Sequence, residues 1–273
     1  STDSVQQLAW DMVQALEQDD FFLNYQPQIN LSTGQLLGVE TLIRWRHPQL
    51  GLVSPATFIP IAEKNGLIVP IGYWVLKQSC LQYQKWRALG IPPFKISVNL
   101  SLRQLQEENL VPRIQAILHE TQMNPQALAL EVTESLMYQE PEKVIARLTR
   151  LKQMGIQVAI DDFGVGYSSL SYLKNLPLHI LKIDKSFLDD LVDTEKDQVI
   201  LQSIIELGHR LNLEIVAEGV ETQGQLELLK TMNCDYGQGY LFSRPLGLDD
   251  ITPFFQTFQK SGLIKSHSVL ALA

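Results

Sequence analysis

The side chains of this chain that could do chemistry stand mostly at the ends of short apolar segments. Glu40 lies inside an otherwise apolar segment, and Glu218 directly follows Ile215-Val216-Ala217. Similar positions are held by Asn99, Glu131, Asp161, Asp162, Lys182, Asp184 and Gln238. Carboxylates gathered in one place repel one another unless protons or cations compensate them. Because hard divalent ions such as Mg²⁺ and Mn²⁺ prefer oxygen ligands, this set of residues indicates a metal site.

Each of these residues also has an ordinary structural explanation when it is taken alone. A single acidic residue at a strand end is most often a helix cap or a half-exposed ion-pair partner. Asp161-Asp162 could begin a turn with Gly164. Asn99 could be a hydrogen-bonded buried amide, and Lys182 could be a surface charge. Chemistry is favoured because several segments carry such groups at once.

The segments that would position these residues alternate between strand-like and helix-like sequence. The expected strands are Phe21–Tyr25, Leu36–Ile43, Lys95–Leu100, Leu128–Val132, Gln157–Ile160, Ile180–Ile183, Glu214–Ala217 and Cys234–Tyr240. The expected helices are Gly72–Leu89, Val111–Thr121, Lys143–Met154, Asp197–Leu211 and Thr222–Met232. This order predicts a parallel sheet that closes into a barrel. The carboxyl ends of such strands converge on one open face, where catalytic groups gather.

The first two expected strands must be arranged differently from the rest. Only the short turn at residues 30–34 separates them, whereas a parallel pair needs a crossover of about a dozen residues or more. We therefore expect an antiparallel hairpin. The fold class that follows is α/β, a TIM-like (β/α)8 barrel with an antiparallel first strand.

Length and charge limit the classes of protein and partner. The 273 residues suit a single barrel of roughly 250 residues. The net charge of −8 argues against a nucleic-acid polymer as partner, because polymer binding usually needs a basic face. No stretch approaches the roughly 20 apolar residues of a membrane span, and no signal peptide opens the chain. We therefore expect a cytoplasmic protein without a membrane segment in this chain.

The cysteines and histidines have spacings that do not indicate a metal site. Cys80 and Cys234 lie far apart, as expected of reduced thiols. No close metal-ligand spacing occurs among His47, His119, His179, His209 and His267. The metal ligands are therefore expected among the oxygen-bearing residues.

A series of short motifs runs in order along nearly the whole chain, from Tyr25-Gln26-Pro27 to Gln238-Gly239-Tyr240. Between these ends lie the motifs Gly38–Trp45, Phe58–Glu63, Val98–Ser101, Glu131–Glu134, Asp161–Ser169, Lys182–Asp184 and Ala217–Thr222. In these motifs the chain resembles the EAL-type cyclic di-GMP phosphodiesterases. The resemblance implies hydrolysis of cyclic di-GMP to linear pGpG.

The resemblance further implies two ions, Mg²⁺ or Mn²⁺, with Ca²⁺ inhibitory because its coordination is longer and looser. The implied ligands of the first ion are Glu40, Asn99, Glu131 and Asp161. Asp161 would bridge to a second ion, whose further ligands would be Asp162 and Glu218.

The resemblance also implies roles in catalysis and substrate binding. Lys182 would hold the attacking water or hydroxide and a phosphate oxygen, Glu218 is alternatively the general base, and Glu40 belongs to the catalytic set. The dinucleotide would be held by Gln26, Arg44, Asp184 and Gln238. The loop that follows Asp162 would be supported by Glu134 and Glu221.

Two positions depart from the family's pattern. The alanine of the family's signature is Thr41 here, and the threonine usual in the Asp-rich loop is Val165. Because Thr41 follows Glu40 on a strand, its side chain should point away from the lumen toward the helix layer, with modest effects on packing. Val165 lies in the loop that carries metal ligands and, in the family, reaches the dimer contact. Loss of a hydroxyl there could loosen Asp161-Asp162 or alter regulation.

The expected organisation has three parts. Residues 1–20 form a helix or linker to an upstream domain, residues 21–260 the phosphodiesterase barrel, and residues 261–273 a tail. The resemblance implies a homodimer and, in a full-length protein, an attached sensor or GGDEF domain.

Two other functions stay open from the sequence. One is a catalytically weak sensor that binds cyclic di-GMP, although members of that kind usually lack one or more ligands and this chain lacks none. The other is a metal-dependent barrel enzyme of another kind, such as a lyase that acts through an enolate. The antiparallel hairpin and the ordered motifs argue against the lyase.

Overall fold

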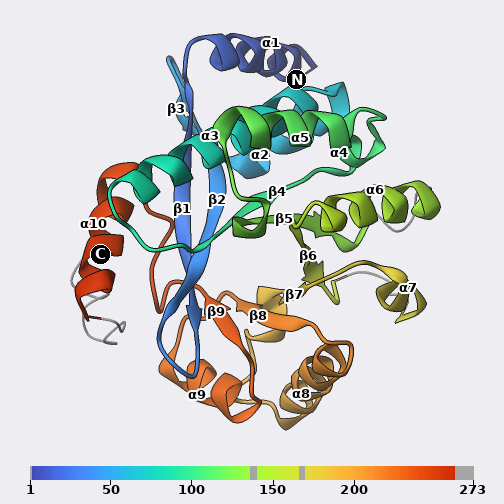
Figure 1. Cartoon of the computed structure of the whole chain (residues 1–273), viewed down its shortest axis with the longest axis vertical. Coiled ribbons are helices and arrows are strands. Elements are labelled where there is room, and N and C mark those ends of the chain that lie inside the picture. Colours follow the sequence, from blue (N-terminus) through green and yellow to red (C-terminus); the bar gives the residue numbers. More distant parts are fainter. Residues whose placement is uncertain (1, 136–139, 166–169, 262–273) are drawn as a thin grey trace.

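A computed structural model describes residues 2–135, 140–165 and 170–261. Its first two strands, β1 (Phe21–Asn30) and β2 (Leu36–His47), form the expected antiparallel hairpin (Figure 1). The Asn30 side chain fixes the turn, since its Oδ1 accepts hydrogen bonds from the backbone N–H groups of Ser32 and Thr33, both at 3.0 Å. Both strands are longer than expected, because their pairing continues as far as Phe21 opposite Trp45 and Ile29 opposite Leu36.

The remaining barrel strands are parallel to β2 and to one another. They are β4 (Lys95–Asn99), β5 (Leu128–Thr133), β6 (Gln157–Phe163), β7 (Ile180–Ile183), β8 (Glu214–Glu218) and β9 (Tyr236–Gln238). β2 pairs with β4, and β9 pairs antiparallel with β1, so eight strands close the barrel. The predicted fold class is therefore confirmed. A short strand, β3 (Gly51–Val53), adds to β2 outside the barrel and was not expected.

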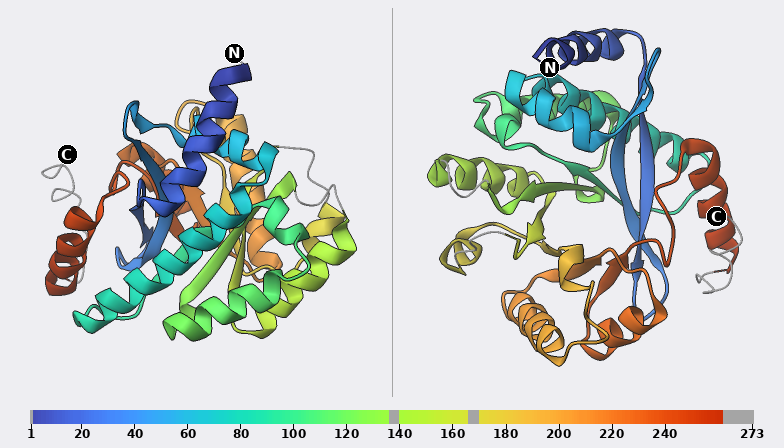
Figure 2. Two further views of the ribbon diagram at one scale, coloured as in Figure 1. Left: turned by 90° about the horizontal axis from the view of Figure 1, so that it is seen from above. Right: turned by 180° about the vertical axis from the view of Figure 1, so that it is seen from behind.

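Helices lie outside the strands (Figure 2). Those that follow the expected positions are α3 (Ile68–Ala88), α5 (Leu110–Thr121), α6 (Pro141–Gln153), α8 (Glu195–Arg210) and α9 (Gln223–Thr231). An N-terminal helix, α1 (Thr2–Glu17), precedes the hairpin. The specific helix predictions did not include α2 (Pro55–Asn65), α4 (Leu102–Gln106), α7 (Leu170–Asn175) and α10 (Leu248–Ser261). The structure also contains the 3₁₀ helices η1 (Pro125–Ala127) and η3 (Lys185–Phe187).

Helix α3 was expected to begin at Gly72 but begins four residues earlier, at Ile68, so Gly72 lies inside the helix. The glycine permits a close contact there, because a Cβ atom at Gly72 would lie 2.3 Å from Oε1 of the buried Gln104. That contact joins α3 to α4, which directly follows the end of β4.

No helix in the described ranges is long and apolar enough to cross a membrane. Of the expected tail at 261–273, all but the first residue lies outside the described part of the chain. Cys80 and Cys234 are buried and free, and burial raises the pKa of each thiol to about 12.

Candidate active site

Lys182 lies at the centre of the side chains that converge at the carboxyl ends of the strands. Its side chain is 1% exposed, and its Nζ atom lies 2.6 Å from Glu40 Oε1 and 2.9 Å from both carboxylate oxygens of Glu131. Glu218 Oε1 is also 2.9 Å from Nζ. These residues come from β2, β5, β7 and β8, so barrel closure is what brings them together.

Glutamine side chains continue this network on the β9–β1 side. Gln238 Nε2 donates to Glu40 Oε1 at 3.1 Å and to Gln26 Oε1 at 2.9 Å. Gln28 Nε2 donates to Gln238 Oε1 at 2.9 Å, and Gln26 Nε2 donates to the Ser243 carbonyl at 3.2 Å. Gln28 and Ser243 were absent from the predicted site. Gln28 could have been found, because it shares a strand face with Gln26.

A carboxylate trio lies beside this network. Asp161, Asp162 and Glu218 each offer an oxygen, and these oxygens lie within 4.8 Å of one another. The backbone N–H of Asp162 donates to Asp161 Oδ1 at 2.8 Å. Asp162 has a φ of 54°, a left-handed conformation that turns the chain at the end of β6.

The pKa values of the most buried groups record an excess of negative charge. Burial raises the pKa of the Glu131 carboxyl well above its usual range, with Glu40 adding to the effect and Lys182 opposing it. Burial also raises the pKa of Glu218, again against the attraction of Lys182. Burial alone would lower the pKa of Lys182, but Glu131, Glu218 and Glu40 hold it well above its usual range. One ammonium therefore does not offset the surrounding carboxylates.

The pKa of Asp162 is also raised. Burial, with Asp161 and then Asp184 adding negative charge, raises its pKa to about 6. Protons or cations must therefore stabilise this group of side chains. An all-oxygen donor set with surplus negative charge fits divalent cations such as Mg²⁺ or Mn²⁺.

The two predicted supporting carboxylates lie in different surroundings. Glu134 is buried, and its Oε2 accepts a hydrogen bond at 3.3 Å from the backbone N–H of Gly164, which follows β6. Its Oε1 is buried, with no hydrogen-bond partner in the described ranges of the chain. Glu221 instead forms a half-exposed ion pair with Lys185 at 2.7 Å, so the structure does not bring it to the carboxylate cluster.

Two further predicted residues border the cluster. The Asp184 side chain caps η3 by accepting from the Ser186 N–H at 2.9 Å. Asn99 is exposed, and its Nδ2 donates to Glu40 Oε2 at 3.3 Å. Val165 is 63% exposed, and the rest of its loop, residues 166–169, lies outside the described part of the chain.

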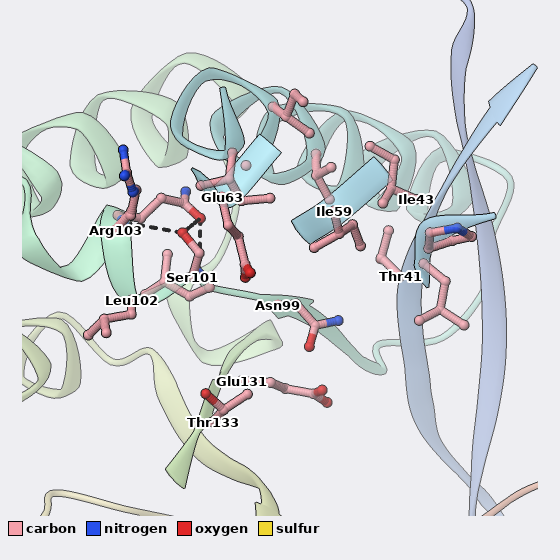
Figure 3. A pocket seen from close by; sticks show the side chains of 18 of the residues that line it. Thr41, Ile43, Ile59, Glu63, Asn99, Ser101, Leu102, Arg103, Glu131 and Thr133 are labelled. Atoms are coloured by element: carbon pink, nitrogen blue, oxygen red, sulfur yellow. Dashed lines mark hydrogen bonds between the residues drawn. The ribbon is translucent and has the colours of Figure 1, made fainter. Parts of the chain in front are cut away.

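A pocket of about 470 Å³ opens beside Asn99 and Glu131. Its apolar wall includes Ile43 on β2 and Ile59 on α2, and its polar lining includes Asn99, Ser101 and Arg103 (Figure 3). The volume lies within the range of roughly 300–1,000 Å³ typical of small-molecule sites. The pocket places an apolar cavity directly beside the carboxylates.

Arg44 and Thr41, both on β2, also line this pocket. The Arg44 guanidinium also lines it and donates to the Ile43 carbonyl at 2.9 Å. Burial lowers the pKa of Arg44, although Tyr240 and Glu40 oppose this. Thr41 is 1% exposed and lines the pocket, whose other walls include α2 and α3, yet its Oγ1 has no hydrogen-bond partner among the residues that the structure describes.

Comparisons with known proteins agree with this architecture. The family model of the EAL domain matches residues 10–245. A bifunctional diguanylate cyclase/cyclic di-GMP phosphodiesterase, MucR of Pseudomonas aeruginosa, is 44% identical over 90% of this chain and 36% of its own length. The cyclic di-GMP phosphodiesterase NbdA of the same organism is 40% identical over 93% of this chain and 32% of its own length. The chain thus spans about a third of each of these relatives.

A solved structure gives the same result in three dimensions. The phosphodiesterase PaMucR in complex with c-di-GMP superposes with a TM-score of 0.85 at 44% identity, covering 90% of this chain and 99% of that one. The sequence motifs, the barrel with its reversed first strand and the family model all agree, and the chain belongs to the EAL domain family.

Proposed function

We propose that the chain hydrolyses one phosphodiester bond of cyclic di-GMP to give linear pGpG, with two Mg²⁺ or Mn²⁺ ions. The observation that carries the proposal is the convergence of carboxylates from β2, β5, β6 and β8 around the buried Lys182. The substrate assignment is supported by the relatives MucR and NbdA, which are described as cyclic di-GMP phosphodiesterases, and by the c-di-GMP complex of PaMucR.

The oxygen donors of the site would hold the ions. Glu40, Asn99, Glu131 and Asp161 would bind the first, and Asp161, Asp162 and Glu218 the second. When bound, such a pair lowers the pKa of water and stabilises charge on the phosphate during in-line displacement.

The protein's own groups would position the nucleophile and take up its proton. Among the carboxylates that contact Lys182, Glu218 is the most exposed at 18%, whereas Glu40 is 8% and Glu131 is 1% exposed. As the alternative to binding the second ion, a Glu218 carboxylate oxygen would therefore accept a proton from water at the open carboxyl-end face of the barrel, while Lys182 Nζ donates to the attacking oxygen or to a phosphate oxygen. The new bond joins the water oxygen to phosphorus, the bond from phosphorus to the 3′ oxygen breaks, and the 3′ oxygen takes up a proton from solvent, while the proton on Glu218 returns to solvent.

Substrate binding would use the two sides of the mouth. Gln26 and Gln238 present amides from β1 and β9, and Arg44 brings a cation that suits the phosphates of the substrate. The apolar pocket wall around Ile43 and Ile59 suits a flat base. Asp184 would contribute from the end of β7. In the same proposal Glu134 supports the loop after β6 through Gly164, whereas Glu221 acts only through its ion pair with Lys185. The chain forms a homodimer, and a full-length protein carries a second signalling domain.

The test is to incubate the chain with cyclic di-GMP and Mg²⁺ or Mn²⁺ and to resolve the products by chromatography. We expect pGpG from the unaltered chain and none from Glu40→Gln. Glu120→Gln is the matched control, because Glu120 is exposed and pairs with Lys77 on the helix layer at 3.0 Å. If cyclic di-GMP binds but is not cleaved with either Mg²⁺ or Mn²⁺, the proposed phosphodiesterase activity is wrong and a cyclic di-GMP-binding sensor is favoured.

A further inference from the structure

Besides its proposed role in holding the nucleophile, Lys182 contacts two of the proposed metal ligands directly. Its ammonium contacts Glu40 Oε1 at 2.6 Å and both oxygens of Glu131 at 2.9 Å. Glu40 and Glu131 are the two glutamates that the proposed function assigns to the first ion. The ammonium therefore lies against the oxygens that the first ion would need.

The same oxygens have other hydrogen-bond donors as well. Gln238 Nε2 donates to Glu40 Oε1 at 3.1 Å, and Asn99 Nδ2 donates to Glu40 Oε2 at 3.3 Å. All four carboxylate oxygens of Glu40 and Glu131 thus accept a hydrogen bond from nitrogen. Glu40 Oε1 accepts two hydrogen bonds, from Lys182 and Gln238, so a divalent ion can bind that oxygen only if one of these contacts is exchanged.

The ammonium is the contact that opposes the ion most strongly. Mg²⁺ binds oxygen at about 2.0–2.1 Å, so it must enter the space between the two glutamates. A neighbouring positive charge also repels it in a site from which water is largely excluded. Lys182 Nζ also lies 2.9 Å from Glu218 Oε1, and the flexible four-carbon stem lets the ammonium keep this contact while it moves away from Glu40 and Glu131.

We propose that Lys182 acts as an internal counter-ion, which stabilises the glutamates before metal binding and weakens metal affinity because its ammonium must be displaced. This inference rests on the proposed function only for the assignment of Glu40 and Glu131 as ligands of the first ion. Its consequence is that metal occupancy responds to the cellular concentration of the ion instead of being permanent.

The test measures metal binding without nucleotide. The full chain is stripped with EDTA and titrated with Mn²⁺ by calorimetry, and free Mn²⁺ is followed by electron paramagnetic resonance. We expect Lys182→Met to bind at least one Mn²⁺ more tightly by about tenfold or more, because an adjacent positive charge changes the proton-binding equilibrium of a carboxylate by about one to three powers of ten and should oppose a bound cation in the same direction. Lys77→Met is the matched control, because Lys77 lies in an exposed ion pair, and it should bind as the unaltered chain does.

Thermal unfolding provides the second readout. Without metal, Lys182→Met should melt at a lower temperature than the unaltered chain, and Mn²⁺ should raise its melting temperature by more. If this variant is unfolded without metal, Mn²⁺ should restore its circular dichroism spectrum. An equal or weaker Mn²⁺ affinity in the folded variant, or an unfolded variant that Mn²⁺ does not restore, overturns the inference.

Two further variants separate charge from side-chain shape. Lys182→Gln removes the charge and should bind Mn²⁺ more tightly, whereas Lys182→Arg keeps the charge and should stay as weak as the unaltered chain. Equal affinities in these two variants would contradict the counter-ion role. The proposed function can be wrong while the counter-ion inference holds: that is the outcome if the unaltered chain binds Mn²⁺ but does not cleave cyclic di-GMP.

Discussion

The buried hydroxyl of Thr41 is expected to lower the stability of the protein, so its removal should raise the free energy of unfolding. Its Oγ1 is buried in a residue that is 1% exposed, and no group in the described part of the chain forms a hydrogen bond with it. A buried hydroxyl that makes no hydrogen bond costs about 1–3 kcal/mol. Thr41→Val replaces that hydroxyl with a methyl group of similar shape, and burial of a methylene-sized group adds about 0.8 kcal/mol of stabilisation.

We therefore expect Thr41→Val to raise the free energy of unfolding by about 1–3 kcal/mol, the methyl contribution being partly offset by imperfect packing. For a chain of this size each kcal/mol corresponds to about 2–4 °C in melting temperature. Differential scanning calorimetry and urea unfolding would measure the change, with the urea midpoint rising at an unchanged slope.

A second threonine provides the matched control. Thr121 is also buried, but its Oγ1 donates to the Ile117 carbonyl at 2.7 Å. Thr121→Val loses that hydrogen bond and should be neutral or destabilised by about 1 kcal/mol. If Thr41→Val is destabilised, or if both variants change by the same amount, the hydroxyl of Thr41 is satisfied in solution and the reasoning is wrong.

Three further expectations concern the metal, His47 and the thiols. EDTA should abolish turnover and Mn²⁺ or Mg²⁺ should restore it, whereas Ca²⁺ should bind and inhibit; product formation after exhaustive chelation would exclude the two-metal mechanism. His47→Ala should keep most turnover but lower the free energy of unfolding by about 1–3 kcal/mol, because His47 Nε2 lies 2.9 Å from Asp11 Oδ2 and Nδ1 accepts two backbone N–H groups. Kinetics and urea unfolding of the same sample would show whether these two effects separate. Cys80 and Cys234 should resist a thiol reagent at pH 8 and react on unfolding, because burial raises both pKa values to about 12 and leaves almost no thiolate; fast labelling of the native chain would show that the barrel opens at these positions.

The sequence was informative where a local rule determines the geometry. The five-residue turn after β1 is too short for a crossover, so the reversal of the first strand could be predicted from spacing alone. The period of two along a strand placed Lys182 and Asp184 on one face, and the polar residues at strand ends predicted which face would be the mouth.

The contacts between strands could not be predicted in the same way. Lys182 alone resembles a surface charge, and its 1% exposure arises only when the barrel closes and brings three glutamates around it. Helix α2 was missed because it is short and contains Pro60, although Ser54 caps its start and Gly66 ends it with a φ of 85°. The pocket wall that α2 provides was therefore missed as well.

The reversed first strand also determines at which end of the barrel a force applied to α1 would act. In a barrel of parallel strands the chain enters the first strand at the end remote from catalysis. Here β1 runs against β2, so Phe21 pairs with Trp45 near the carboxyl end of β2, and α1 reaches the barrel at the catalytic end. Helix α1 contacts α2, which lies beside it at the end of the hairpin opposite the turn (Figure 1). A pull or twist applied to α1 would therefore reach the pocket wall at Ile59 through the contact with α2, and would reach β2 through the Asp11–His47 contact.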